Sequence, residues 1–292
     1  MRMVWPLVGV VVFGSSLLIL SLSISENAQA GDPVLVGAGD IGTCKQQSDE
    51  ATAKLLANIS GTVYNLGDNV YENGTAAEFA NCYGPSWGTF KYRTRPSVGN
   101  HEYNTPGATG YYGYFGAKAG DPSKGYYSYN MGSWHIVVLN SNCAKVACAA
   151  GSTQERWLRA DLAAHPSKCT LAYFHHPRFS SGGNNIGVAP FWKALYEAGA
   201  EVVLSGHVHA YERFAPQNPS GVADSAKGIR EFIVGTGGKN LGRLDYLKPN
   251  SQVRNNTTYG VLKLILHSSS YEWKFVPIAS KTFTDSGTNM CH

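Results

Sequence analysis

Five short polar clusters, most of them at the end of an apolar run, constrain the fold of this chain more than any other feature. They are Gly39-Asp40-Ile41-Gly42, Gly67-Asp68-Asn69-Val70-Tyr71, Gly99-Asn100-His101-Glu102, His175-His176-Pro177 and Gly206-His207-Val208-His209. Val63 to Leu66, for example, has the pattern of a short buried strand, and Gly67 permits a sharp exit that leaves Asp68 at its carboxyl end. Open α/β sheets build their sites at such ends. The sequence therefore predicts an α/β protein with Asp68 at the centre of its site.

The hydrophobic pattern between the clusters predicts two sheets with helices. Further strands are expected at 33–37, 95–98, 171–174, 202–204, 231–234, 259–266 and 271–277, and a hairpin at 126–140. Helices are expected from Ser48, from Ser152, where Glu155 would complete a capping box, and over 188–197. Because strands alone follow Glu212, a mixed sheet packed on a second sheet explains the pattern better than a doubly wound fold.

The segment 103–114 contains glycine, threonine, proline and four tyrosines. This composition predicts a long loop with aromatic anchors. Such a loop can serve as a lid that faces the substrate. The alternative is that its tyrosines pack on the surface of their own domain.

The amino terminus has the composition of an export signal. Arg2 precedes an apolar run from Val4 to about Ile24, and Ala28-Gln29-Ala30 then places small residues at the spacing that signal peptidase cleaves. We therefore expect a signal peptide over 1–30 and one domain over 31–292, secreted or held in a periplasmic or extracellular space. The alternative is an uncleaved membrane anchor, because about twenty apolar residues can span a bilayer.

Charge and cysteine content narrow the class of function. The formal net charge of +4 is unchanged without residues 1–30, because that segment holds one arginine and one glutamate. Such a modest, evenly spread charge does not indicate a nucleic-acid surface, so no specific nucleic-acid partner is expected. All six cysteines follow residue 30, and an even number in an exported protein favours disulfides. Of the many pairings that six cysteines allow, proximity in the chain suggests Cys44–Cys82, Cys143–Cys148 and Cys169–Cys291.

The string Gly37-x-Gly39-x-x-Gly42 matches the dinucleotide-binding fingerprint. In that interpretation Asp40 would point a carboxylate toward a pyrophosphate, and the later clusters would have no purpose. We therefore reject a dinucleotide site.

The polar clusters instead supply ligands for metal ions. The candidate ligands are Asp40, Asp68, Tyr71, Asn100, His175, His207 and His209. Oxygen and imidazole ligands without thiolates suit zinc, iron, manganese or similar ions. They are too many for one tetrahedral ion, and a bridging Asp68 divides them between two. Because side chains at i and i+2 of an extended chain point to the same side, His207 and His209 can each serve one ion of a close pair.

Two such ions suit the transfer of a phosphoryl group to water. They can clamp phosphate oxygens and lower the pKa of a bound water to give hydroxide, so no covalent nucleophile is needed. The departing alkoxide needs a proton, and His101, next to Asn100, is the candidate general acid.

Each of these residues also has a simpler explanation when it is taken alone. Asp40 or Asp68 could cap a helix or form a turn. His175 and His176 could be core histidines bonded to the backbone, and Glu102 could serve only to orient His101. For the metal hypothesis to fail, all five clusters would have to be coincidences.

The ordered motifs Gly-Asp-x-Gly, Gly-Asp-x-x-Tyr, Gly-Asn-His-Glu, His-x-Pro and Gly-His-x-His resemble those of the calcineurin-like metallophosphoesterases. Tyr71 and the run from Gly206 to Arg213 look most like the purple acid phosphatase branch. The resemblance covers about Val34 to Arg213. It implies a four-layer α/β/β/α sandwich, with two central mixed β-sheets flanked by helices and the metals at one edge. The chain resembles the compact catalytic domain of the plant enzymes without their large amino-terminal β domain.

The resemblance also implies roles for the site residues. One ion would take Asp40, Asp68, Tyr71 and His209, and the other Asp68, Asn100, His175 and His207. His101 and His176 would face the phosphate or the leaving group. In the purple branch a tyrosinate marks a ferric ion, so Tyr71 suggests iron paired with zinc, manganese or a second iron. With Asn at position 69 and Glu72 after the tyrosine, Tyr71 could instead be rotated away, which would leave an ordinary divalent pair.

We therefore expect an exported binuclear-metal phosphoesterase that hydrolyses small phosphomonoesters by attack of a metal-bound hydroxide. One rival is a phosphodiesterase or nuclease on the same metal pair, which only a comparison of substrates can separate. Another is a binding module that keeps the fold without turnover, and the complete ligand set argues against it. Membrane contact is expected only if residues 1–30 stay attached, and the sequence carries no indication of an oligomeric state.

Overall fold

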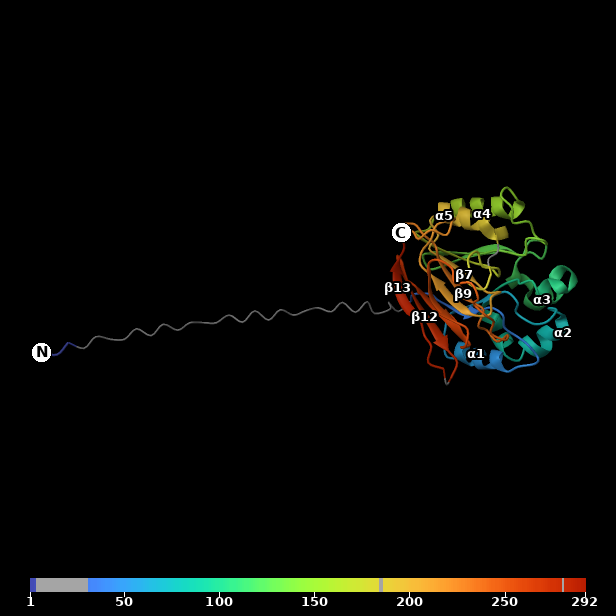
Figure 1. Ribbon diagram of the computed structural model, residues 1–292, viewed down its shortest axis with the longest axis horizontal. Coiled ribbons are helices and arrows are strands. Elements are labelled where there is room, and N and C mark those ends of the chain that lie inside the picture. Colours follow the sequence, from blue (N-terminus) through green and yellow to red (C-terminus); the bar gives the residue numbers. More distant parts are fainter. Residues whose placement is uncertain (4–30, 184–185, 280) are drawn as a thin grey trace. The chain divides into compact units, whose positions relative to one another are not determined.

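Two mixed β-sheets form the centre of the computed structural model, and helices cover their outer sides (Figure 1). The structure describes residues 1–3, 31–183, 186–279 and 281–292. Within it, Asp32–His292 is one compact unit. The α/β/β/α layering predicted for this part is confirmed, whereas the expected signal peptide falls almost wholly on 4–30, outside the described residues.

The first sheet has six strands and carries three of the polar clusters. In spatial order its strands are β13 (Ser286–Met290), β12 (Ser270–Pro277), β11 (Gly260–Leu266), β1 (Val34–Ala38), β2 (Thr62–Leu66) and β3 (Thr94–Ser97). β1, β2 and β3 run parallel, so their carboxyl ends lie at the same edge. β11, β12 and β13 complete the sheet with antiparallel pairing.

The second sheet has seven strands and carries the two histidine clusters. Its order is β10 (Ser251–Asn255), β8 (Tyr211–Phe214), β9 (Arg230–Val234), β7 (Val202–Ser205), β6 (Cys169–Tyr173), β5 (Trp134–Val138) and β4 (Tyr127–Met131). β5, β6, β7 and β9 are parallel neighbours. The predicted hairpin over 126–140 is the antiparallel pair β4 and β5.

The central strands of the second sheet are buried on both faces, which explains their continuous apolar sequence. Along β5, Ile136 and Val138 belong to the core cluster shared with the first sheet, whereas Val137 belongs to the cluster under the helices. Along β6, Leu171 and Ala172 divide in the same way.

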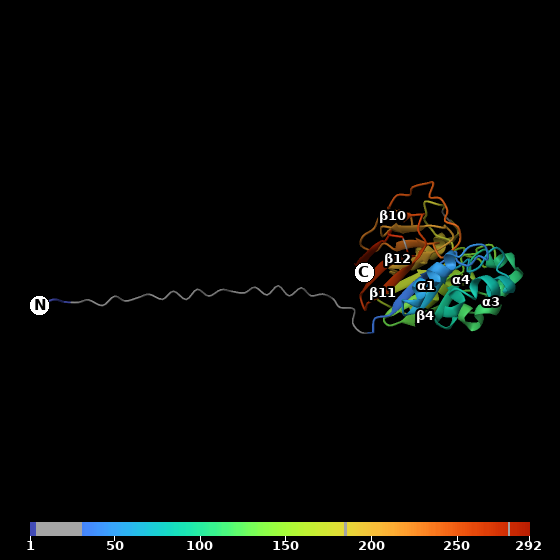
Figure 2. The same cartoon turned by 90° about the horizontal axis from the view of Figure 1, so that it is seen from below.

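Helices close both outer faces. α4 (Thr153–Ala164) and α5 (Ala189–Glu197) lie together over the second sheet (Figure 1). α1 (Ser48–Ala57) lies along the first sheet beside β11 (Figure 2). Ser152 caps α4 as predicted, because its hydroxyl accepts a hydrogen bond from the Glu155 backbone N–H at 3.2 Å. The expected capping box is not formed, because the Glu155 carboxylate accepts from the backbone N–H of Gly151 at 2.9 Å and the Ser152 N–H donates to the Ala149 carbonyl oxygen at 2.9 Å. Among the described residues, no helix has both the length and the apolar character needed to cross a bilayer.

The prediction of a loop over 103–114 is wrong. Two 3₁₀ turns, Glu102–Asn104 and Pro106–Ala108, lead into α3 (Thr109–Phe115), which lies near the short α2 (Ala76–Glu78). Gly107 takes a φ of 66°, so the glycine that suggested a loop forms the kink between short helical pieces. Aromatic side chains that pack on Phe79 hold the segment in place.

Three strands were not expected from the sequence: β8, β10 and β13. Exposure alternates along β10 and β13, and neither contains a fully buried residue. Such strands carry little hydrophobic signal, so their existence depends on pairing with neighbours that are far away in sequence.

The three expected disulfides are all present. They join Cys44 to Cys82, Cys143 to Cys148 and Cys169 to Cys291. The last of them links the start of β6 in the second sheet to the residue that follows β13 in the first.

Candidate metal centre

Five strands from the two sheets end at one shared edge, and each of them is followed by one of the predicted site residues. The side chains that follow β1, β2, β3, β6 and β7 are, respectively, Asp40, Asp68, Asn100, His175 and His207. Tyr71 follows Asp68 closely, and His209 lies in the link between β7 and β8. The fold therefore brings all seven predicted ligands to the same edge.

The backbone at this edge is held in unusual conformations. Asp40, Asp68 and His207 have φ values of 59°, 47° and 67°. Non-glycine residues rarely take this left-handed conformation, and it is concentrated at functional sites. The neighbouring glycines are required by crowding: a Cβ on Gly99 would lie 2.1 Å from Asp68 Oδ1, and one on Gly206 would lie 2.7 Å from Asp40 Oδ2.

The donor atoms form two groups, and Tyr71 lies in the first. Its Oη is 2.8 Å from Asp40 Oδ1, 3.1 Å from Asp68 Oδ2 and 3.2 Å from His209 Nε2. His209 Nε2 is also 3.3 Å from Asp40 Oδ1. The other ring nitrogen of His209 faces the carbonyl oxygen of Asn240 at 2.8 Å, which leaves Nε2 as the nitrogen that faces Asp40 and Tyr71.

His175 is the centre of the second group. Its Nε2 lies 3.3 Å from Asp68 Oδ2, 3.0 Å from Asn100 Oδ1 and 3.2 Å from His207 Nδ1. Its Nδ1 faces the Leu66 carbonyl oxygen at 2.7 Å, so here too the backbone engages one ring nitrogen and leaves Nε2 facing the other donor atoms. Neighbouring ligands of one ion, each bound at about 2.0–2.2 Å, lie roughly 3 Å apart. Both groups have this spacing.

Burial and charge favour cations at this edge. The side chains of Asp40 and Asp68 are buried, and among the described residues their ion pairs are with histidines alone. Burial opposes ionisation of Asp68, but the neighbouring His175 outweighs it and lowers the carboxyl pKa. Burial and the two carboxylates raise the pKa of Tyr71 well above its usual value. The phenol therefore stays neutral unless positive charge is added, and the donor set as a whole fits metal ions.

His101 and His176 flank the two groups. His101 Nδ1 lies 2.7 Å from the Glu72 carbonyl oxygen, and its Nε2 lies 3.9 Å from Asp68 Oδ2. His176 Nδ1 lies 2.9 Å from Ser141 Oγ, and its ring centroid is 4.5 Å from that of His207. Burial, with positive charge on neighbouring imidazoles, lowers the pKa of His176. The sequence did not indicate that Ser141 holds this ring.

Glu102 has a structural role different from the orientation of His101 that the sequence suggested. Its fully buried carboxylate accepts hydrogen bonds from the backbone N–H groups of Asp68 at 3.1 Å, Asn69 at 2.7 Å and Gly99 at 2.7 Å. It thus joins the loops after β2 and β3 and fixes the backbone around Asp68. The only sequence signal was its place in the Gly-Asn-His-Glu motif.

Comparison with known proteins identifies the family. The family model described as calcineurin-like phosphoesterase matches residues 34–211. The chain belongs to this family. Its matched region begins at β1 and ends in β8, so it includes every strand end that delivers a predicted ligand.

Relatives of this calcineurin-like phosphoesterase include the purple acid phosphatases. Purple acid phosphatase 15 of Arabidopsis thaliana is 28% identical over 214 residues, which are 60% of this chain and 40% of the relative. The chain thus spans about two fifths of that relative's length. The solved purple acid phosphatase PPD1 of yellow lupin (Lupinus luteus) superposes with a TM-score of 0.71 at 18% identity, over 89% of this chain and 54% of the other.

The same fold occurs in a protein whose description names no enzyme. GAP50, described as the anchor in the inner membrane complex of Plasmodium, superposes with a TM-score of 0.65 at 14% identity, over 87% of this chain and 88% of that one. Fold alone therefore does not decide catalysis, and the argument for activity has to come from the site.

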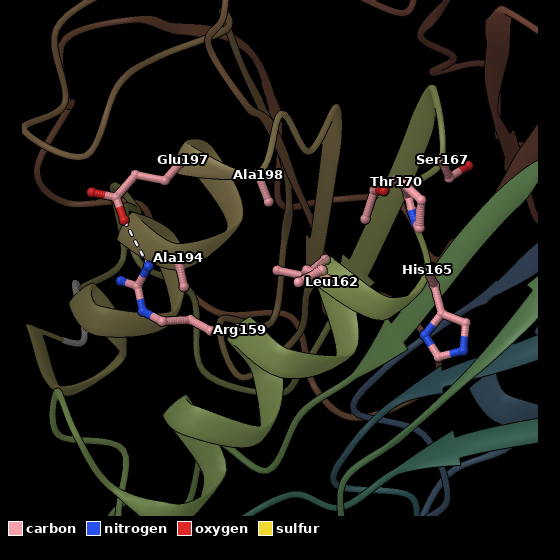
Figure 3. Close-up of a pocket in the computed structure, with 10 residues that line it drawn as sticks. Arg159, Leu162, His165, Ser167, Thr170, Ala194, Glu197 and Ala198 are labelled. Atoms are coloured by element: carbon pink, nitrogen blue, oxygen red, sulfur yellow. Dashed lines mark hydrogen bonds and ion pairs between the residues drawn. The ribbon is translucent and has the colours of Figure 1, made fainter.

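A second group of metal-ligating residue types lies away from this centre, and we call it the helix-side cluster. It consists of His135, Asp161 and His165. His165 also borders a hollow of about 380 Å³ between α4, α5 and the start of β6 (Figure 3). This hollow lies at the amino end of β6, whereas His175 follows its carboxyl end. The Arg159 guanidinium on its wall is already paired with Glu197 at 2.8 Å.

Proposed function

We propose that this calcineurin-like phosphoesterase hydrolyses phosphomonoesters with the help of two metal ions at the shared edge of its sheets. One observation carries the proposal: a single oxygen, Asp68 Oδ2, faces both donor groups, at 3.1 Å from Tyr71 Oη and 3.3 Å from His175 Nε2. A carboxylate shared in this way is what a pair of close ions requires.

The division of ligands follows the two groups. One ion would be held by Asp40, Asp68, Tyr71 and His209, and the other by Asp68, Asn100, His175 and His207. The ions would supply positive charge to the phosphate and lower the pKa of a water molecule. A tyrosinate at position 71 would favour iron in the first site, with zinc, manganese or a second iron in the other.

His101 supplies the proton that the reaction needs. The attacking water gives up one proton to solvent, its oxygen bonds to phosphorus as the bond from phosphorus to the alcohol oxygen breaks, and the alcohol oxygen takes up a proton. The Nδ1 atom of His101 is engaged by the Glu72 carbonyl oxygen, so Nε2 is the atom that can give this proton. The side chain is 28% exposed, so a bound ester can reach it.

The proposal also includes export of the protein from the cytoplasm. The three disulfides described above are typical of proteins that fold outside the cytoplasm. We assign residues 1–30 to a cleaved signal peptide and 31–292 to the mature catalytic domain. Amino-terminal sequencing of the exported protein tests this assignment, and a chain that still begins with Met1 would contradict it.

Metal analysis together with the visible spectrum is the decisive experiment. Mass spectrometry of protein purified from its export compartment should give about two ions per chain, and a visible charge-transfer band would identify a ferric ion bound by Tyr71. The same sample should cleave p-nitrophenyl phosphate faster than bis(p-nitrophenyl) phosphate, which has the same leaving group. Two ions with no turnover of either ester would contradict the proposal, and a preference for the diester would turn it into a phosphodiesterase.

A further inference from the structure

A pocket of about 350 Å³ opens beside the metal centre, and we call it the side pocket. Asn100 and His176 form its inner wall, and Tyr103 with Asn104 forms another. Its outer wall is the loop Ser141–Lys145, which follows β5. The side pocket is therefore continuous with the donor group around His175 and lies outside that group.

The outer wall is held rigidly. The Asn142 amide nitrogen donates to the Val98 carbonyl oxygen at 3.2 Å and to Asn140 Oδ1 at 3.0 Å, and its side chain is almost fully buried. The disulfide between Cys143 and Cys148 closes the same loop. A preformed wall with hydrogen-bonding groups is typical of a ligand site.

The side pocket is positively charged at its rim. Lys145 is the one lysine or arginine that lines it, and aspartate and glutamate are absent from its lining within the described chain. The Lys145 backbone N–H donates to the Asn142 carbonyl oxygen at 2.8 Å, which places the side chain beside the pocket. Within the described residues its ammonium group forms no ion pair. An anionic group in the pocket would be attracted to it without displacing a carboxylate.

The side pocket also adjoins the proton donor. The Asn104 amide on its wall donates to the Glu72 carbonyl oxygen at 3.0 Å, and the same oxygen faces His101 Nδ1 at 2.7 Å. One carbonyl oxygen therefore holds both His101 and a wall of the side pocket, so the pocket lies close to His101 as well as to the donor group around His175.

We propose that the side pocket holds the alcohol part of the ester, and that Lys145 makes the enzyme prefer alcohols that carry a second negative group, such as a carboxylate or another phosphate. This inference rests on the proposed function. Because the Lys145 side chain is exposed, its attraction to an anion is screened by solvent, and we expect a preference of about threefold to fivefold rather than absolute selectivity.

A matched pair of substrates tests the assignment. 2-Phosphoglycerate and glycerol 2-phosphate share the same ester, and one has a carboxylate where the other has a hydroxymethyl group. We expect Lys145→Ala to lower the ratio of kcat/KM for 2-phosphoglycerate to that for glycerol 2-phosphate by about threefold to fivefold. Lys145→Glu should lower the ratio further, and Lys145→Arg should keep it. Glycerol 2-phosphate itself should change by less than about twofold in all three variants.

Further measurements distinguish a wrong role for Lys145 from a wrong proposed function. Lys54→Ala removes an exposed lysine from α1 and should leave the ratio unchanged. In the wild type the preference should shrink as salt is added. A ratio that is unchanged in both Lys145→Ala and Lys145→Glu would overturn the role of Lys145 and leave the phosphatase proposal standing. A wild-type enzyme that cleaves neither ester would overturn the proposed function and the side pocket's role with it.

Discussion

The metal centre and the helix-side cluster contain similar residues in different arrangements. At the metal centre, donor atoms from separate strand ends converge on two points. In the helix-side cluster the rings of His135 and His165 are stacked, with centroids 4.8 Å apart and planes 14° apart. Imidazole lone pairs lie in the ring plane, so these two rings do not aim at one point.

The two regions also differ in whether their nitrogen and oxygen atoms already have hydrogen-bond partners. Both nitrogens of His135 already have partners, Asn130 Oδ1 at 2.8 Å and Asp161 Oδ2 at 2.9 Å, and Ser128 donates to Asp161 Oδ1 at 2.8 Å. At the metal centre the backbone engages one nitrogen each of His175 and His209 and leaves the other facing carboxylates. Proximity of histidine and aspartate therefore indicates a metal site only when their lone pairs converge and are not already used.

Removal of the shared carboxylate should give the largest contrast between the two regions. Asp68→Ala takes the common oxygen from both donor groups, so bound metal should fall from about two ions per chain to less than one and kcat by roughly 10³-fold or more. Asp161→Ala should change neither quantity in folded protein. Metal analysis and phosphate release measure both, and loss of metal from the Asp161 variant would show that the helix-side cluster binds an ion.

His101→Ala should separate chemistry from metal binding. The variant should keep its metal ions, and its turnover of alkyl phosphates should fall by about 10²- to 10⁴-fold because the leaving alkoxide lacks its proton donor. Turnover of p-nitrophenyl phosphate should fall much less, since p-nitrophenolate leaves without a proton. His165→Ala is the matched control and should retain both activities. Equal losses on the two substrates would remove His101 from the role of general acid.

The helix-side cluster should contribute to stability and leave chemistry unchanged. Asp161→Ala leaves His135 Nε2 and Ser128 Oγ without their partner in a largely buried site, so the free energy of unfolding should fall by about 1–3 kcal/mol. Urea unfolding measures this, with the exposed Lys54→Ala as a reference for an inert substitution. An unchanged midpoint would mean that the pair contributes nothing net.

The contribution of Asp161 to stability against acid should be the smallest of the expected effects. Burial alone would raise the pKa of Asp161, but hydrogen bonds from His135 and Ser128 outweigh it and hold the pKa below its usual value. A carboxyl whose folded pKa is depressed adds stability that is complete above its unfolded pKa of about 3.9 and is lost as the pH falls through the folded value. Asp161→Asn should therefore lose less stability than the wild type below about pH 4. Parallel acid-unfolding curves would contradict this.

The convergence of the candidate ligands could be predicted because these residues lie in compact motifs. Asp40, Asp68 and His207 each follow a glycine at the end of a buried strand, and a parallel sheet brings such ends together. The contacts of Glu102 could not be predicted, since they depend on where the backbone N–H groups of another loop point. The place of Lys145 beside the side pocket was also not predicted, because Lys145 follows β5, which carries no ligand motif.

The fold was predicted where apolar residues run continuously along a buried strand. β5 and β6 carry apolar residues on both faces, so they were recognised as strands. β10 and β13 are half-exposed and depend on their neighbours, and they were not. β8 is largely buried, but Glu212 and Arg213 interrupt its apolar pattern, and it was missed. The helix α3 was obscured by glycine and proline, whose place in the turns before it becomes clear only once the aromatic contacts with Phe79 are known.

β6 belongs to the second sheet, and it is connected to the first sheet near both of its ends. At its start, Cys169 is bonded to Cys291, beyond the last strand of the first sheet. Past its other end, His175 faces the carbonyl oxygen of Leu66, the last residue of β2. One sheet therefore cannot slide over the other without breaking a covalent bond or pulling His175 away from Asp68. The spacing of the donor atoms is therefore protected against a sliding movement of the sheets. The strand that leads to the candidate ligand His175 also keeps the two halves of the site aligned.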